Sequence, residues 1–198
     1  MTCLCLTKDR RQWLPLAIEC FRQQTYRNAE LLILADGDDV RDLLPDDPRI
    51  RLIHLEGSPN IGDKRNFGCT HAAGDVIAHW DDDDHSAPGR LADQIQRLDV
   101  SGKNVTGFHS MRFTDGVDWW KYTGDACYAL GTSLCYRRAW WSSHRFDSVQ
   151  VGEDNRFVGI AAGHGELVST DAGELLHATI HPGNTSPRGC GSSWKKLC

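Results

Sequence analysis

Four consecutive aspartates, Asp81-Asp82-Asp83-Asp84, directly follow the apolar stretch 76–80. Carboxylates this close repel one another, so the arrangement favours a bound cation. In extended chain alternate side chains point the same way, which would give Asp81 and Asp83 a common face toward one hard divalent metal ion. Such an ion also carries phosphate oxygens. The run therefore predicts a site for a metal and a nucleotide diphosphate, with a solvated acidic turn as the structural alternative.

The first half of the chain alternates short apolar runs with helical patterns. Strands are predicted over 2–7, 31–35, 50–55 and 76–80, and helices over 13–24, 61–73 and 88–98. This alternation predicts an α/β fold with a parallel sheet and helices on its faces. Ligands of such sheets bind at the carboxyl ends of the strands. We therefore expect residues 7–10, residues 36–39 and the acidic tetrad to converge.

The second half of the chain has strand patterns separated by turn signals. Strands are predicted over 105–113, 119–122, 128–136, 167–169 and 175–180, and a helix is predicted to open at Gly152-Glu153-Asp154. The turn signals Asp115-Gly116 and Gly124-Asp125 favour an antiparallel or mixed extension of the sheet. From Gly183 onward the chain is rich in Gly, Ser and Pro, which indicates a flexible tail or flap, or plain disorder.

Length and composition restrict the class of protein. A chain of 198 residues fits one domain, with a core large enough to be stable without disulfide bonds or structural metal ions. The net charge of -5, without an extensive basic patch, is unfavourable for nucleic-acid binding. No apolar stretch has membrane-spanning length, so no direct membrane span is expected. Eight cysteines without paired C-x-x-C spacing indicate buried, reduced thiols, and these features together predict a cytoplasmic protein.

Six short motifs occur one after another at the ends of the predicted elements. They are Thr7 with Arg10; Glu30-Leu31-Leu32-Ile33-Leu34-Ala35-Asp36-Gly37; Lys64-Arg65-Asn66-Phe67-Gly68; the acidic tetrad followed by Pro88-Gly89-Arg90-Leu91; Gly152-Glu153-Asp154; and His181-Pro182-Gly183-Asn184-Thr185-Ser186. With its motifs in this order, the chain resembles the nucleotide-sugar-dependent glycosyltransferases of the GT-A fold, most closely the inverting family 2. The resemblance spans nearly the whole chain.

The resemblance implies a fold and a domain plan. The fold would be GT-A, a Rossmann-like, mostly parallel sheet with helices on both faces, extended by a mixed or antiparallel acceptor half. The plan is a single domain over 1–198. It would comprise a nucleotide-sugar-binding half (1–100), an acceptor and catalytic half (101–182) and a flexible tail or flap (183–198).

The resemblance also implies metal-dependent transfer of a sugar, with inversion, from a nucleotide-sugar such as a UDP-sugar to a carbohydrate or other hydroxyl acceptor. The donor would be bound by Thr7, Arg10, Asp36, Arg65, Asp81 and Asp82. Asp36 would accept a hydrogen bond from an N–H of uracil, and Arg65 would reach the base or diphosphate. The structural alternatives are a turn cap for Asp36 and a surface ion pair for Arg65. Ala35 and Asp38 depart from the commoner family pattern of aspartate and serine, which bears on the identity of the nucleotide.

The metal ion implied by the resemblance is Mn2+ or Mg2+. Asp83 would bind it, and Asp81 would contact the ion, its bound water or the ribose. Asp82 or Asp84 would substitute if the register within the tetrad differs. His181 would be a further ligand from the far end of the chain, and would hold the start of the tail over the bound diphosphate.

The Gly-Glu-Asp triplet matches the family segment that supplies the catalytic base. Inverting transfer needs a carboxylate that takes the proton of the acceptor hydroxyl, and Asp154 is the first candidate, with Glu153 second. The structural alternative is an acidic first turn of a helix. Trp119 or Trp120 would offer a flat face to an acceptor sugar, although tryptophans more often pack in cores.

Two other functions remain open from the sequence alone. A nucleotidyltransferase-like enzyme that processes sugar nucleotides would also use clustered aspartates, but it would typically carry a glycine-rich phosphate loop after the first strand, and none is present there. A non-catalytic nucleotide- or sugar-binding module would have no need of Asp154 and His181. Release of nucleoside diphosphate, release of pyrophosphate, or binding without turnover would distinguish the three functions.

Overall fold

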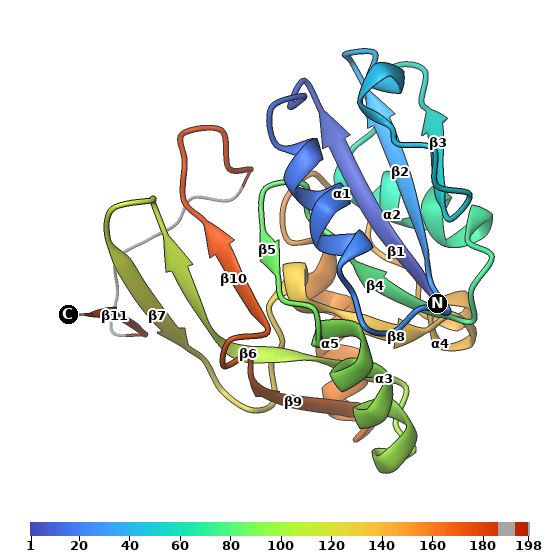
Figure 1. Cartoon of the computed structure of the whole chain (residues 1–198). Helices are drawn as coiled ribbons and strands as arrows, with labels where there is room; N and C mark the ends of the chain where they lie inside the picture. The colour runs from blue at the N-terminus through green and yellow to red at the C-terminus, as the bar shows by residue number, and fades with distance from the viewer. Residues whose placement is uncertain (186–192, 198) are drawn as a thin grey trace.

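Four parallel strands form the part of the sheet built by the first half of the chain (Figure 1). The computed structural model describes residues 1–185 and 193–197. In spatial order the strands are β3 (Ile50–His54), β2 (Glu30–Asp36), β1 (Thr2–Lys8) and β4 (Val76–His79). All neighbouring pairs among them are parallel, so the predicted parallel sheet is confirmed. Their carboxyl ends consequently share one edge of the sheet.

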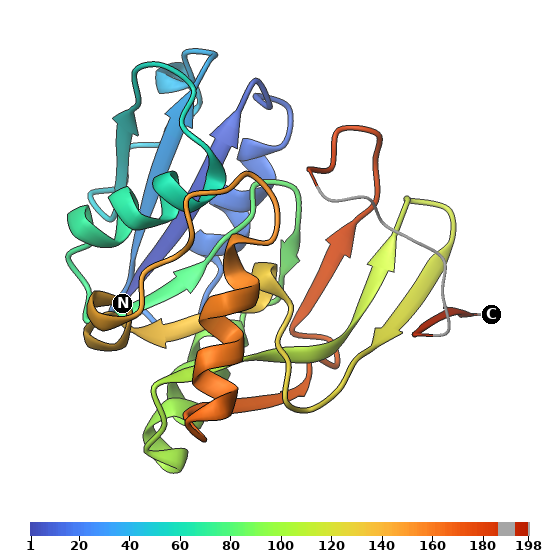
Figure 2. The same ribbon diagram turned by 180° about the vertical axis from the view of Figure 1, so that it is seen from behind.

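Helices cover both faces of this sheet, as Figures 1 and 2 show. They are α1 (Leu14–Arg22), α2 (Ile61–His71), α3 (Arg90–Ser101) and α5 (Glu153–Gly163). Side chains of β1 alternate between the faces, because Cys3 and Cys5 share a core with α1 and α3 whereas Leu4 shares one with α2 and α5. Burial on both faces explains why β1, β2 and β4 consist mainly of apolar residues.

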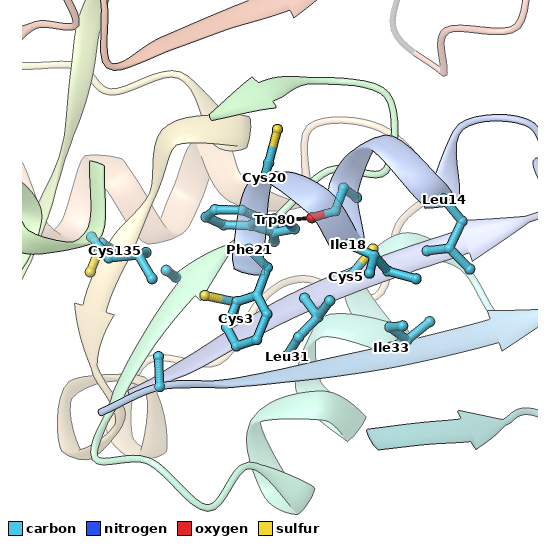
Figure 3. Close-up of a cluster of buried hydrophobic side chains, with 14 of the residues drawn as sticks. Cys3, Cys5, Leu14, Ile18, Cys20, Phe21, Leu31, Ile33, Trp80 and Cys135 are labelled. Carbon is cyan, nitrogen blue, oxygen red and sulfur yellow. Dashed lines mark hydrogen bonds between the residues drawn. The ribbon is translucent and has the colours of Figure 1, made fainter. Parts of the chain in front are cut away.

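Trp80 anchors the chain on the α1 face immediately before the acidic tetrad (Figure 3). Its ring meets Phe21 edge to face, with the ring centroids 6.4 Å apart. Its indole N–H donates to the carbonyl oxygen of Ala17 at 3.0 Å. A buried indole with a satisfied N–H is held in one orientation, and this fixes where the tetrad begins.

Antiparallel pairing extends the sheet beyond β4. The further strands are β5 (His85–Ser86), β6 (Val105–Thr114), β7 (Trp119–Thr123), β8 (Cys135–Arg137), β9 (Leu167–Asp171) and β10 (Leu176–Thr179). Strand β8 is antiparallel to both β4 and β6, and β7 is antiparallel to β6. Strands β9 and β10 run parallel to β6, while β10 is antiparallel to β5. The predicted mixed extension is therefore confirmed.

The strand predicted over 128–136 is wrong in its first part. Only β8 is a strand, because Gly131–Ser133 form a 3-10 turn, η2, before it. The Ser133 hydroxyl donates to the carbonyl oxygen of Leu130 at 2.7 Å and accepts from the backbone N–H of Phe108 at 2.8 Å. These side-chain bonds replace sheet bonds, as Ser commonly does in turns.

The end of the predicted tail contains a strand, since Trp194–Leu197 form β11 and pair with β7 in antiparallel register. The tail residues 186–192 and 198 lie outside the described residues.

Among the six cysteines that the structure describes, five are buried free thiols, as predicted, and Cys127 is exposed. Over the described ranges, no helix is long and apolar enough to cross a membrane.

The loop 147–152, which leads into α5, lies directly against the start of α2. The backbone N–H of Gly62 donates to the carbonyl oxygen of Val149 at 3.2 Å. A Cβ atom at Gly62 would lie 1.8 Å from the carbonyl oxygen of Asp147, so no side chain fits there. The amide of Asn60, the N-cap residue of α2, donates to the Ser148 hydroxyl at 3.0 Å. These contacts fix the approach of the chain to α5.

We predict that Gly62→Ala destabilises the protein by about 1–3 kcal/mol, because the new methyl group meets a backbone oxygen that cannot rotate away. Gly159→Ala is the matched control. Gly159 lies in α5 with open space around its Cβ position, so alanine there should stabilise the protein by about 0.5–1 kcal/mol through helix propensity. Urea unfolding of both variants checks the pair, and equal effects in one direction would contradict the proposed loop contact.

Candidate active site

A cavity of about 340 Å³ lies at the carboxyl edge of the parallel strands, where the polar clusters were expected to converge. Seven of the predicted site residues line it: Arg10, Arg65, Asp81, Asp82, Asp83, Glu153 and Asp154. The other predicted residues, which are Thr7, Asp36, His181, Trp119 and Trp120, are not among its lining residues in the described chain. The loop after β1, the loop after β4 and the start of α5 thus meet around one space.

Asp82 and Asp83 are tied to groups from both ends of the chain. The Arg10 guanidinium donates to Asp82 Oδ1 at 3.1 Å and to Asp83 Oδ2 at 3.0 Å. His181 Nε2 lies 2.9 Å from the same Asp83 oxygen, and the Asn184 amide donates to it at 3.3 Å. Burial and the neighbouring Asp83 raise the pKa of Asp82 to about 6. The side chains of Arg10, His181 and Asn184 thus converge on one oxygen of Asp83.

Asp84 and Asp81 have other partners. The Thr132 hydroxyl of η2 donates to Asp84 Oδ2 at 2.5 Å, and the backbone N–H of Thr179 donates to its other oxygen at 3.1 Å. Asp81 is the most exposed carboxylate of the four, and its Oδ1 lies 3.9 Å from Arg65 Nη2. The four carboxylates consequently occupy four different environments.

Asp81, Asp83 and Asp84 form a cluster fit for a divalent metal ion. One carboxylate oxygen from each lies within 4.8 Å of the others. Hard oxygen donors of this kind suit Mg2+ and Mn2+. The geometry keeps the predicted pair Asp81 and Asp83, adds Asp84, and leaves Asp82 outside the cluster. Sequence reasoning left Asp84 only as a substitute because the register within four identical residues cannot be read.

His181 lies beside this cluster, in a turn that is itself hydrogen-bonded. Its ring stacks on Trp13 with the centroids 4.7 Å apart. Its backbone N–H donates to the Asn184 side-chain oxygen at 2.7 Å, and Arg10 donates to the carbonyl oxygen of Gly183. The segment 181–184 is thereby held at the tetrad. Trp13 and Asn184 had no assigned role in the sequence analysis.

Asp36, which was predicted to contact the nucleotide base, is buried at the end of β2 and paired with a lysine. Lys64 donates to Asp36 Oδ1, and Lys8 Nζ lies 3.8 Å from the other oxygen. Asp36 Oδ2 has no hydrogen-bond partner within residues 1–185 and 193–197, and the buried Thr7 hydroxyl lies near Asp82. The partner Lys64 stands next to Arg65 in the sequence, and this adjacency is the signal that could have assigned it a role.

Glu153, the second candidate for the base, is held in a buried ion pair. Arg65 Nε donates to Glu153 Oε1 at 2.8 Å, and both side chains are only 7% exposed. The Nη1 of Arg65 is buried and has no hydrogen-bond partner in the described part of the chain, although the residue lines the cavity. The Glu153 carboxylate is thus occupied by Arg65, whereas the unpaired guanidinium N–H of Arg65 is ready to bind an anionic ligand.

Asp154 has the properties of a proton acceptor. Burial, followed by the charge of Glu153, raises the pKa of Asp154 to about 6. A carboxylate whose pKa lies near neutrality is suited to general-base catalysis. A Cβ atom at Gly131 would lie 2.2 Å from Asp154 Oδ2, so any larger residue there would displace this carboxylate. Gly131 was missed because a glycine in a predicted strand gives no sign of a distant neighbour.

The two tryptophans predicted to contact an acceptor lie on β7, the strand that pairs with β11. Trp119 is 38% exposed, and its ring meets His177 edge to face at 5.0 Å. Lys196 lies over the ring of Trp120 at 5.9 Å. Tyr128 and Leu130 are among the residues of the second half of the chain that line the cavity. Acceptor contact by either tryptophan stays a prediction.

Comparison with known proteins identifies the family. The model described as "Glycosyl transferase family 2" matches residues 4–172, and the chain belongs to this family. It is 30% identical over 129 residues to an uncharacterized glycosyltransferase of Rickettsia felis, a match that covers 55% of this chain and 21% of that protein. It is 42% identical over 59 residues to the succinoglycan biosynthesis protein ExoO of Rhizobium meliloti, covering 30% of this chain and 17% of that protein. The matched regions make up only about a fifth of these relatives.

Solved structures share the fold. TarS of S. aureus in complex with UDP-GlcNAc aligns with a TM-score of 0.74 at 16% identity, covering 93% of this chain and 59% of that one. The mannosyltransferase PcManGT from Pyrobaculum calidifontis, in complex with GDP-Man and Mn2+, aligns with a TM-score of 0.70 at 12% identity, covering 90% and 56%. The expected GT-A fold is therefore confirmed.

We predict that Asp154→Asn stabilises the protein at pH 8 by about 1–3 kcal/mol and has little effect at pH 4. The folded-state pKa of about 6 exceeds the ordinary value of 3.8, so the wild type loses stability as the pH rises through this window. Asparagine cannot ionise and escapes the loss. Chemical unfolding at several pH values measures the difference.

Asp171→Asn is the control of opposite sign, because hydrogen bonds from Lys121, Gly173 and Ser110 lower the pKa of Asp171 to about 2 despite partial burial. This variant should lose stability relative to the wild type as the pH rises from 2 to 4. A pH-independent effect of Asp154→Asn would contradict the buried environment assigned to that carboxyl.

Proposed function

We propose that the chain is a metal-dependent, inverting glycosyltransferase that transfers a sugar from a UDP-sugar to the hydroxyl of a carbohydrate or other acceptor. The main support is that Asp154, with its raised pKa, lines the same cavity as Asp81 and Asp83 of the acidic cluster. Arg65 spans the space between them, because it bonds Glu153 and lies 3.9 Å from Asp81. A base and a diphosphate site that share one cavity are what displacement at a sugar carbon needs.

The donor would lie along the edge formed by β1, β2 and β4. Thr7 and Asp36 would contact the nucleoside, and Asp36 Oδ2 has no hydrogen-bond partner in the described part of the chain. Arg10 and Arg65 would bind the diphosphate, for which a guanidinium is well suited. Uridine is proposed from the uracil contact at Asp36 and from the likeness to TarS, which binds UDP-GlcNAc. PcManGT binds GDP-Man, so the choice of nucleotide needs its own test.

The metal ion, Mn2+ or Mg2+, would be held by Asp83, Asp81 and Asp84, with His181 alongside. When bound, it would supply positive charge against the negative charge that develops on the departing nucleoside diphosphate. The Arg10 guanidinium already lies on Asp83 and Asp82, and it would turn toward the phosphates when the ion is present. PcManGT, which has the same fold, is in complex with Mn2+ in its solved structure.

The transfer step would depend on residues of the second half. Asp154 Oδ would take the proton of the acceptor hydroxyl as that oxygen attacks the sugar carbon, on the side opposite the diphosphate. The buried pair Arg65–Glu153 would hold the start of α5 in place. Tyr128 and Leu130 would shape the acceptor wall, and Trp119 or Trp120 would extend it toward longer acceptors.

A donor panel tests the proposed function. The wild-type chain is incubated with UDP-glucose, UDP-GlcNAc, UDP-galactose and GDP-mannose, with Mn2+ or with EDTA, and nucleoside diphosphate release is measured. We expect slow release of UDP from one of the UDP-sugars, and we expect this release to require the metal ion. Pyrophosphate release would instead indicate a nucleotidyltransferase, and binding without turnover a non-catalytic module.

We predict that Asp154→Asn retains donor binding and loses turnover by about two to four orders of magnitude, as expected when a general base is removed from an otherwise intact site. Asp99→Asn, an exposed change on α3, is the matched control and should keep full turnover. Donor affinity is measured by calorimetry and turnover by diphosphate release. Near-normal turnover of Asp154→Asn would transfer the role of base to Glu153.

A further inference from the structure

A second cavity, of about 560 Å³, lies at the opposite end of β4 from the acidic tetrad. Asp75, at its rim, immediately precedes β4, whereas Asp81 follows the strand. Six residues of extended chain span about 20 Å, so this cavity is separate from the site described above. Figure 1 shows α4 (Arg138–Ser143) and β8 at this end of the sheet, away from the arrowheads of β1 and β2.

The cavity is basic although the chain as a whole carries a net charge of -5. Arg137, Arg138 and Arg145 line it, together with the single carboxylate Asp75. Arg138 Nη2 lies 3.5 Å from Asp75, whose side chain is 98% exposed. Arg137 pairs at 3.1 Å with Asp99, which is not among the lining residues. Exposed pairs of this kind are weak, so both guanidinium groups can exchange these partners for another anion.

Part of this positive charge serves the fold. Arg138 donates to the carbonyl oxygen of Ala72 at 2.9 Å, just beyond the end of α2, where the helix dipole is negative. The same account does not extend to Arg145. Its guanidinium lies over the ring of Trp141, 5.0 Å from the centroid, and within the described residues it has no carboxylate or carbonyl partner.

The arginines are held in place by the core beneath them. The backbone N–H of Arg138 donates to the carbonyl oxygen of Asp75 at 2.8 Å, and β8 pairs with β4. Asn66 Oδ1 accepts both the indole N–H of Trp141 at 2.9 Å and the backbone N–H of Phe146 at 3.1 Å. This shared acceptor fixes the segment that carries Arg145. A rigid floor with several guanidinium groups above it is preorganised for an anion.

We propose that this cavity binds the phosphate group of a larger molecule. Planar guanidinium groups match phosphate oxygens in bidentate geometry, and the Thr70 and Ser142 hydroxyls at the rim can donate further hydrogen bonds. The volume falls in the range of small-molecule sites, so the phosphate is carried on an organic group. A soluble phosphate ester and an anionic lipid headgroup share this chemistry.

Two binding measurements on the intact chain separate these sources. In the first, inorganic phosphate is titrated at constant ionic strength while the N–H signals of the arginine side chains and of the Trp141 indole are followed by nuclear magnetic resonance. In the second, sedimentation with phosphatidylglycerol vesicles is compared with sedimentation with phosphatidylcholine vesicles. Both use the wild type, Arg145→Gln and the charge-matched control Arg22→Gln, which alters an exposed arginine on α1.

We expect saturable shifts of the Arg145 and Trp141 signals, and an affinity for phosphate that falls about tenfold or more in Arg145→Gln and not in Arg22→Gln. This result supports a soluble phosphate ester. Pelleting with phosphatidylglycerol that depends on Arg145, without a response to inorganic phosphate, supports a lipid headgroup. Absence of both responses, or equal losses in the two variants, would overturn the proposal.

Discussion

Repulsion among the four carboxylates after β4 is the constraint on which the site depends. The chain offsets it with positive and hydrogen-bonding groups that come from segments far apart in sequence. Arg10, from the loop after β1, lies on Asp82 and Asp83, the Thr132 hydroxyl lies on Asp84, and His181 lies on Asp83. The offset is incomplete, since burial and the neighbouring charge still raise the pKa of Asp82 to about 6. A site with this residual repulsion favours a further cation, which links the local electrostatics to the proposed metal ion.

A buried arginine joins the two halves of the sheet next to the tetrad. Arg90 is buried below the tetrad and donates to the carbonyl oxygens of His79 at 2.8 Å and Thr132 at 3.0 Å, so β4 and η2 are held together from beneath. Its guanidinium also lies over Trp80, at 5.1 Å from the ring centroid. Because η2 also contains Gly131, which leaves space for the Asp154 carboxyl, the acidic tetrad and Asp154 are positioned by one rigid unit. This arrangement explains how a short strand such as β4 can orient groups on both sides of a cavity.

Much of this could be predicted from the sequence, for identifiable reasons. The parallel strands β1, β2 and β4 have apolar runs buried on both faces. The carboxyl ends of parallel strands share one edge of the sheet, so the meeting of Arg10 with the tetrad followed from topology. What could not be predicted depends on contacts distant in sequence. The ion pairs Lys64–Asp36 and Arg65–Glu153, the fit of Gly131 against Asp154 and the 3-10 turn before β8 arise only when separate elements pack. A run of four identical aspartates does not show which of them face the same side, so the place of Asp84 in the cluster could be found only from the structure.

The most direct test of the account is Mn2+ binding measured by electron paramagnetic resonance with UDP present. The signal of free Mn2+ decreases when the ion binds to the chain. The size of the decrease gives the number of bound ions, and the measurement does not depend on enzymatic turnover. We expect one Mn2+ per chain in the wild type, and at least tenfold weaker binding in Asp83→Asn, which keeps the shape of the side chain and removes its charge. Asp99→Asn should bind like the wild type. Equal Mn2+ affinity in Asp83→Asn and the wild type would contradict the claim that the tetrad holds the metal and the diphosphate.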